Sequence, residues 1–220
     1  MIEVSADPAR RVAELLAEAA RAGGQIALTG GSAPRPAYEL AAELEPDWSE
    51  AHVWWGDERC VPPDDERSNY RLAEESLLSR LAERPVEHRI LGELAPAVAA
   101  DTYDAELEGV RLDLVLLGMG PDGHVASLFP GSPGLEERLR RAIAATPALE
   151  PFVERVSMTL PVLTGAAHVV FMVVGAAKAE TVARAFEDEP SAETPASLVR
   201  GLRTTVVLDV AAASRLRSSP

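Results

Sequence analysis

Residues 112–134 read L-D-L-V-L-L-G-M-G-P-D-G-H-V-A-S-L-F-P-G-S-P-G, and this stretch decides the fold of the chain. Its first six residues are almost all apolar, which predicts a strand buried on both faces of a parallel sheet. Three glycines and a proline between residues 118 and 123 then end the strand, as expected of a tight turn. The segment V-A-S-L-F that follows is compatible with a helix that stops at Pro130. The pattern therefore predicts a strand, a turn and a helix start in succession.

His124 stands directly after the turn, with Asp122 two residues before it. Ligands bind at the carboxyl edge of open α/β sheets, and a helix start offers unpaired backbone N–H groups to an anion or an oxyanion. A single histidine in a surface loop is usually incidental. Here the buried strand, the glycines and the neighbouring carboxylate favour a functional site instead.

Further strands and helices alternate on both sides of this stretch. Apolar runs predict strands over residues 25–29, 52–55, 156–160, 168–174 and 204–210. Helical patterns predict helices over residues 7–22, 35–44, 69–81, 101–107, 176–186 and 195–200. Asp7 is the expected N-cap of the first helix, with Pro8 at its first position, and residues 135–145 are interpreted as a charged surface helix or loop. The alternation predicts an α/β fold with a mainly parallel sheet, as a single domain over residues 1–220.

The composition is that of an ordinary soluble globular protein, with 47% hydrophobic and 25% charged residues among 220. A formal charge of −14 argues against non-specific nucleic-acid binding but leaves room for a small anionic ligand. Cys60 is the only cysteine, so no disulfide can form within the chain. No signal core and no membrane-spanning apolar run is apparent, and a cytoplasmic protein is expected.

Three other predicted strand ends carry residues capable of chemistry. They are Gly30-Gly31-Ser32, the run G-D-E-R at residues 56–59, and Gly175 followed by Lys178. In a parallel sheet these ends lie on the same edge as His124. This convergence, more than any single motif, predicts an active site.

The Gly30-Gly31-Ser32 turn can bring backbone N–H groups and a hydroxyl to a phosphate. It matches neither the dinucleotide pattern G-x-G-x-x-G nor the P-loop, so neither a dinucleotide nor ATP is favoured. Lys178, the only lysine in the chain, can reach the same edge and pair with a phosphate, although an ordinary exposed helix lysine is the alternative.

The basic residues after two other strands are candidates for an anion site. A run such as D-E-R is usually a solvated face, but at a strand end Arg59 can hold a carboxylate, a phosphate or an oxyanion, and Asp57 can orient it. Arg155 is a further cation that can face the ligand or the solvent.

His124 is the one side chain suited to take and return a proton near neutral pH, and Asp122 can fix its tautomer. The other three histidines are expected to be structural. Four scattered histidines and one cysteine show no metal-ligand spacing, so no metal is expected. Cys60 and the serines lack the arrangement of an activated nucleophile. The residues thus predict a general base beside a pocket for a small phosphorylated molecule, with Arg59 or turn N–H groups stabilising an oxyanion.

The chain resembles the 6-phosphogluconolactonases in five segments spread over nearly its whole length. They are L-T-G-G-S-A-P-R-P-A-Y (28–38), W-G-D-E-R-C-V-P-P-D-D-E-R-S-N-Y (55–70), L-L-G-M-G-P-D-G-H-V-A-S-L-F-P-G (116–131), R-V-S-M-T-L-P-V-L (155–163) and G-A-A-K-A (175–179). The resemblance implies a three-layer α/β/α fold with a doubly wound sheet, shared with glucosamine-6-phosphate deaminases. It also implies hydrolysis of 6-phospho-D-glucono-1,5-lactone to 6-phospho-D-gluconate, in the oxidative pentose phosphate pathway, without cofactor or metal.

Carried over by position, His124 resembles the general base that activates water and then protonates the leaving ring oxygen, with Asp122 supporting it. The segment Gly30, Gly31 and Ser32 resembles the phosphate site, together with Lys178 and, as a helper, Arg155. Arg59 resembles the residue that steadies the lactone. Ala33 stands where the family usually has threonine, so one phosphate hydroxyl is missing.

Two other functions remain as alternatives. Amino-sugar-6-phosphate deaminases of the same fold typically continue after D-G-H with A-F-N-E-P, whereas this chain has A-S-L-F-P and no acid there. A phosphosugar-sensing regulatory module would carry a DNA-binding segment, and none is evident in this acidic chain. The expected partner is a small-molecule substrate, with no nucleic acid or membrane, and a monomer or weak homodimer.

Overall fold

The computed structural model describes residues 1–148 and 150–217. Within them, one sheet contains seven strands, namely β1 (Ile2–Val4), β2 (Gln25–Leu28), β3 (His52–Trp55), β5 (Val86–His88), β6 (Leu114–Leu117), β9 (His168–Val173) and β10 (Arg203–Leu208). Their order is β1-β10-β9-β6-β2-β3-β5, and every neighbouring pair is parallel. The predicted parallel sheet is therefore confirmed.

The direction of winding reverses between β2 and β6. From β2 the chain continues outward to β3 and β5, whereas from β6 it continues the other way to β9 and β10. The loops that follow β2 and β6 therefore leave the sheet toward opposite sides. Such a reversal opens a crevice at the carboxyl ends of the strands. The doubly wound fold places the turn after β2 and the turn after β6 side by side at this crevice.

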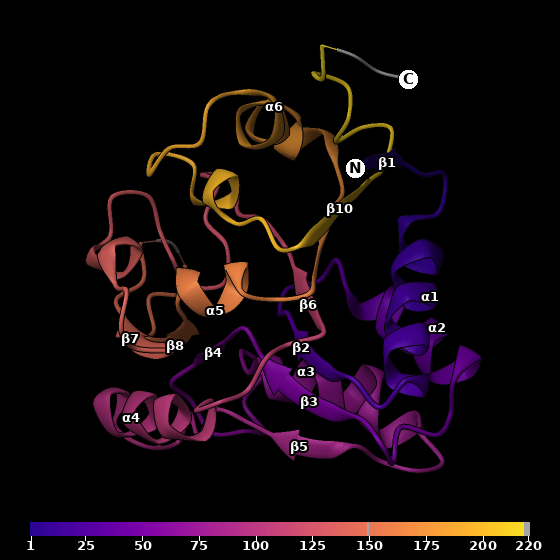
Figure 1. The fold of residues 1–220 in the computed structure, drawn as a ribbon, viewed down its shortest axis with the longest axis vertical. Coiled ribbons are helices and arrows are strands. Elements are labelled where there is room, and N and C mark those ends of the chain that lie inside the picture. The colour runs from indigo at the N-terminus through magenta and orange to yellow at the C-terminus, as the bar shows by residue number, and fades with distance from the viewer. Residues whose placement is uncertain (149, 218–220) are drawn as a thin grey trace.

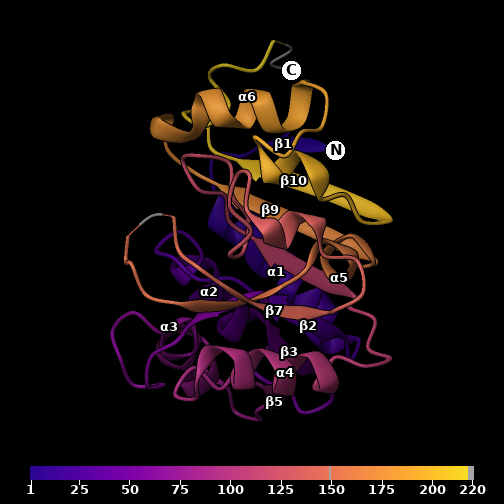
Figure 2. The ribbon, with the colours of Figure 1, turned by 90° about the vertical axis from the view of Figure 1, so that its left-hand side faces the viewer.

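The elements form three layers (Figures 1 and 2). Helices α1 (Pro8–Arg21) and α2 (Arg35–Leu44) cover one face of the sheet, and α3 (Asn69–Ser76) packs on α2. Helices α4 (Pro96–Glu106) and α5 (Leu160–Thr164), with a second small sheet, lie on the opposite face, at the left of Figure 1. Helix α6 (Ala179–Glu187) follows β9. Short 3₁₀ turns span Leu78–Arg80, Pro133–Glu136, Ala176–Lys178 and Pro195–Leu198.

Local sequence accounts for the best predicted elements. All four residues of β6 are buried, as an uninterrupted apolar run requires. Helix α1 begins after Asp7, whose carboxylate accepts a hydrogen bond from the backbone N–H of Arg10 at 3.0 Å, and Pro8 occupies the first turn. None of the helices in the described part has both the length and the apolar character that crossing a membrane requires.

A second, small sheet was not predicted, although one of its strands overlaps the strand predicted at residues 156–160. It is antiparallel, in the order β4-β8-β7, and consists of β4 (Asp57–Arg59), β7 (Ala142–Ala145) and β8 (Arg155–Met158). The chain leaves the large sheet at Gly56, whose N–H donates to Leu28 and whose carbonyl accepts from Met158. The charged run D-E-R, which was expected only to follow the end of a strand, is therefore itself a strand. The interpretation of residues 135–145 as a surface helix or loop is wrong where β7 forms.

The helix predicted directly after His124 is also absent from the described structure. Residues 125–129 form turns, with an isolated bridge between Val125 and Leu128 and a positive φ of 47° at Ala126. Tertiary contacts override the local pattern, because the Ser127 N–H donates to Ser157 Oγ and the Ser127 hydroxyl donates to Asp57. A helix N-terminus therefore does not supply an anion site at His124.

Candidate active site

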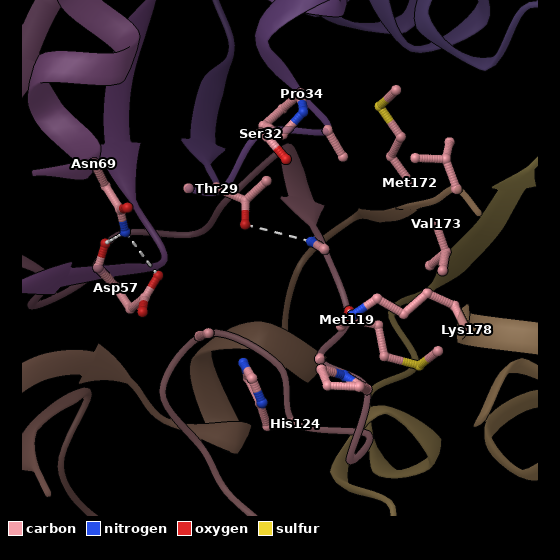
Figure 3. A pocket seen from close by; sticks show the side chains of 18 of the residues that line it. Thr29, Ser32, Pro34, Asp57, Asn69, Met119, His124, Met172, Val173 and Lys178 are labelled. Carbon is pink, nitrogen blue, oxygen red and sulfur yellow. Dashed lines mark hydrogen bonds between the residues drawn. The ribbon is translucent and has the colours of Figure 1, made fainter. Parts of the chain in front are cut away.

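A cavity of about 600 Å³ lies at the carboxyl edge of the large sheet, where the winding reverses (Figure 3). The loops after β2, β6 and β9 and the strands β4 and β8 all contribute to its wall. Seven of the eight predicted site residues line it: Gly30, Gly31, Ser32, Arg59, His124, Arg155 and Lys178. The eighth, Asp122, contacts His124 from outside the cavity wall. The structure thus brings the predicted residues together, while their roles stay predictions.

His124 and Asp122 form a hydrogen-bonded pair. Nδ1 of His124 lies 2.6 Å from Oδ1 of Asp122, which also faces the backbone N–H of His124 at 3.2 Å. An ionised carboxylate only accepts hydrogen bonds, so Nδ1 carries the proton and Nε2 is left as an acceptor. Burial raises the pKa of Asp122, but its hydrogen bonds and the charge of His124 outweigh this, and the pKa lies below its usual value. The imidazole points into the cavity in Figure 3, as a general base must.

Gly120 makes room for this pair. A Cβ built at Gly120 would lie 2.1 Å from Nδ1 of His124 and 2.5 Å from Oδ1 of Asp122. The backbone N–H of Gly120 also donates to the carbonyl of His124 at 2.9 Å, which closes the turn. The turn therefore leaves no room for a side chain at position 120 beside the two members of the pair.

Lys178 reaches the loop of His124 from the other side of the cavity. Its position is the last residue of the 3₁₀ turn before α6, and its Nζ donates to the carbonyl of Met119 at 2.9 Å. An ammonium has three N–H groups, so further donors remain for a ligand. Burial lowers the pKa of Lys178, partly opposed by the charge of Asp122. This is the arrangement expected of a cation that grips a phosphate.

The turn after β2 forms the opposite rim of the cavity. Gly31 has a φ of 89°, in the left-handed region that favours glycine, and Ser32 is exposed. Helix α2 follows without a side-chain cap. The buried hydroxyl of Tyr38 fixes the start of the turn, because it accepts from the N–H of Thr29 at 2.9 Å and donates to its carbonyl at 2.7 Å. The turn is thus fixed by Tyr38 on its buried side, while Ser32 is exposed.

Arg59 and Arg155 stand directly opposite each other in the pairing of β4 with β8. Arg155 is only 4% exposed, and burial lowers its pKa. The Nε atoms of both arginines are buried and have no hydrogen-bond partner among the described residues. Two guanidinium groups facing one cavity favour an anionic ligand. Arg155 is thus not a surface residue.

The expectation that Asp57 orients Arg59 is wrong. Asp57 instead accepts from the Ser127 hydroxyl at 2.6 Å and from Nδ2 of Asn69 at 3.1 Å, and lies 3.9 Å from NH1 of Arg155. Arg59 donates to the backbone carbonyl of Arg67. The carboxylate is drawn to partners on other elements, which the sequence does not reveal.

Two further residues on this side of the cavity were missed. Asn69 lines the cavity, and Glu58 lies behind it as a buried carboxylate. Glu58 accepts hydrogen bonds from the backbone N–H of Arg59, Asn69 and Tyr70 and from the hydroxyl of Ser68. The available signal was the helix start S-N-Y ten residues after Glu58, with Ser68 as the N-cap.

A family model described as "Glucosamine-6-phosphate isomerases/6-phosphogluconolactonase" matches residues 2–208. The chain belongs to this family. A protein of Oryza sativa named "Probable 6-phosphogluconolactonase 3, chloroplastic" is 40% identical over 202 residues, which cover 83% of this chain and 61% of that protein. The 6-phosphogluconolactonase of Streptomyces coelicolor is 36% identical over 227 residues, with 92% and 86% covered.

Solved structures agree with this assignment. The crystal structure of the 6-phosphogluconolactonase of Thermotoga maritima matches with a TM-score of 0.80 and 29% identity, over 95% of this chain and 97% of that one. The rice relatives are longer, and the chain spans about three fifths of their length. The bacterial relatives, by contrast, are matched over most of their length.

Proposed function

We propose that this chain is a 6-phosphogluconolactonase, which hydrolyses 6-phospho-D-glucono-1,5-lactone to 6-phospho-D-gluconate. The observation that carries the proposal is the His124–Asp122 pair, which opens onto a cavity lined by Lys178, Arg59 and Arg155. The names of the bacterial relatives matched over most of their length support the same reaction. Because the cavity draws on residues from Thr29 to Lys178, we propose that the chain acts as one catalytic domain.

In the proposed mechanism, Nε2 of His124 removes a proton from a water molecule as that water attacks the lactone carbonyl. Asp122 holds the imidazole in the required tautomer and stabilises its charged form. Arg59 stabilises the oxyanion of the tetrahedral intermediate. When the intermediate collapses, the protonated His124 returns its proton to the ring oxygen that leaves. These groups supply base, acid and electrostatic stabilisation, so the proposal includes neither metal nor cofactor.

The phosphate binds at the other end of the substrate in this proposal. The Gly30–Gly31–Ser32 turn offers backbone N–H groups and a hydroxyl, and Lys178 and Arg155 offer positive charge. Ala33 supplies no hydroxyl, which costs about one neutral hydrogen bond, or ~1 kcal/mol. Binding at this end fixes the lactone carbonyl near His124 without taking part in the chemistry.

One feature favours lactone hydrolysis over amino-sugar deamination. Phe129 matches the glutamate of the deaminase segment A-F-N-E-P, which assists ring opening, and its ring centroid lies 4.7 Å from that of His124. An apolar ring at this position cannot transfer a proton. A regulatory module is disfavoured because such a module has no use for a base paired with a carboxylate.

The test is a coupled assay with freshly generated 6-phosphogluconolactone, corrected for spontaneous opening of the lactone. We expect the chain to accelerate hydrolysis, and His124→Ala to lower kcat by about 10²- to 10⁴-fold, the usual contribution of a general base. Calorimetric binding of 6-phosphogluconate should be largely unchanged in this variant. A wild-type chain without activity would refute the function, and an unchanged kcat in His124→Ala would refute the base.

A further inference from the structure

Asn69 is the only asparagine in the chain, and the function proposed above does not use it. It is the first residue of α3, it is 2% exposed, and it lines the cavity. In Figure 3 Asn69 and Asp57 lie on one side of the cavity, while Lys178 and Val173 lie on the other. In a buried side-chain amide, both the oxygen and the nitrogen are expected to have a hydrogen-bond partner.

The orientation of the amide is fixed by its hydrogen bonds. Nδ2 of Asn69 donates to the carbonyl oxygen of Asp57 at 2.8 Å and to Oδ1 of Asp57 at 3.1 Å. Both partners are acceptors, so the flipped amide would place an oxygen against two oxygens. The nitrogen therefore faces Asp57, and Oδ1 is the branch left for another donor.

The oxygen of this amide is kept uncovered by a glycine. A Cβ built at Gly30 would lie 1.9 Å from Oδ1 of Asn69 and 2.3 Å from its Cγ. Within the described residues, Oδ1 accepts no hydrogen bond. Because Gly30 and Asn69 both line the cavity, a donor inside the cavity can reach this oxygen.

The position of Oδ1 is also fixed through the backbone. Glu58 accepts from the N–H of Asn69 at 2.7 Å and from the N–H of Tyr70 at 2.8 Å, so the start of α3 is tied to β4. Glu58 is 3% exposed and receives two more hydrogen bonds, from Arg59 and Ser68. The acceptor is thus set in place before a ligand arrives, which lowers the entropy cost of binding.

The chemistry of this oxygen selects its partner. An amide oxygen only accepts hydrogen bonds, so it repels a phosphate or a carboxylate and binds a hydroxyl group. We infer that Oδ1 of Asn69 accepts a hydrogen bond from a ring hydroxyl of the sugar, which makes Asn69 a specificity-determining residue. This inference rests on the proposed function, because it takes the ligand to be a phosphorylated sugar lactone.

The experiment compares 6-phosphogluconolactone with its 2-deoxy, 3-deoxy and 4-deoxy analogues. We expect the wild-type chain to favour the parent lactone over one of these analogues by about tenfold in kcat/KM, the value of one hydrogen bond. Asn69→Ala should reduce that particular ratio to about one and leave the other two ratios unchanged. Calorimetry with 6-phosphogluconate and the matching deoxy acid gives the same comparison without turnover.

Two more variants keep the test decisive. In Gly30→Ala the new Cβ would lie 1.9 Å from Oδ1, so the amide of Asn69 must shift, and the discrimination should also be lost even if Asn69→Ala does not fold. Ser76→Ala alters a buried residue of the same helix whose hydroxyl bonds to Leu72, away from the cavity, and should keep all three ratios. Equal kcat/KM for all four lactones in the wild type, or discrimination that persists in Asn69→Ala and Gly30→Ala, would overturn the inference. A wild-type chain inactive on every lactone would instead overturn the proposed function.

Discussion

Replacing Gly120 with alanine should disable the proposed catalytic pair of His124 and Asp122, although neither of these two residues is itself substituted. The new Cβ would lie 2.1 Å from Nδ1 of His124, 2.2 Å from its Cε1 and 2.5 Å from Oδ1 of Asp122. Ordinary contact begins near 3.4 Å, so the imidazole must retreat by about 1.3 Å. A displacement of about 1 Å in a catalytic group can cost about 100-fold in rate. We therefore expect kcat to fall by about 100-fold.

The assay is steady-state hydrolysis of freshly generated 6-phosphogluconolactone, with KM measured alongside kcat. KM should change little, because the atoms nearest to the new Cβ belong to His124 and Asp122 and not to Lys178 or Ser32, the proposed phosphate contacts. Gly56→Ala is the matched control, since a Cβ there meets Leu28 at 3.5 Å in ordinary contact and does not line the cavity. A kcat for Gly120→Ala within threefold of the wild type, in a folded variant, would refute the reasoning.

The remaining predictions concern charge at two ends of the sheet. Lys178→Met should raise KM by about 10- to 100-fold with a smaller change in kcat, because it removes a charge-assisted hydrogen bond to phosphate; lost turnover at normal KM would contradict this role. Arg59→Gln should instead lower kcat more than it raises KM, which the same steady-state data would show or disprove. Burial, together with the charge of Arg203, lowers the pKa of His168 to about 4. Below about pH 6.5 this histidine therefore binds a proton in the unfolded chain but not in the native state. The free energy of unfolding should fall by about 3 kcal/mol as the pH falls to 4. Urea unfolding across this range measures the loss, and His168→Gln, which cannot titrate, should flatten it; an equal slope in both proteins would exclude His168 as the cause.

The elements that the sequence predicts best are those buried on both faces. Strands β6 and β9 appear as unbroken apolar runs because a parallel sheet covered by helices on both sides admits few polar side chains. The edge strands β1 and β5 are three residues long and partly exposed, so they carry no such run. Strand β4 is made of charged residues and pairs with β8, far along the chain, while Glu58 is bonded to the start of α3 nearby. No local pattern predicts a strand at this position.

The candidate site likewise has a part that the sequence predicts and a part that it does not. The turns after β2, β6 and β9 could be placed together because parallel strands share an edge, and glycines mark where they end. The position of Asn69 depends on Glu58, and the partners of Asp57 come from three other elements. Such contacts follow from tertiary packing, which overrides local preference. The same packing turned the expected helix after His124 into a series of turns.

The reversal between β2 and β6 has a consequence for how the protein folds. The two strands are joined through Ile26–Leu114 and Ala27–Val115, and Thr29 Oγ1 continues the seam by accepting from the N–H of Gly118 at 3.3 Å. These partners are 88 or 89 positions apart, so the seam closes only after a long stretch of chain has been ordered. Neither half of the molecule carries both the turn at Gly30 and the imidazole at His124. During refolding, regain of the proposed lactonase activity should therefore trail the recovery of helical signal, because that activity requires the long-range pairing of β2 with β6.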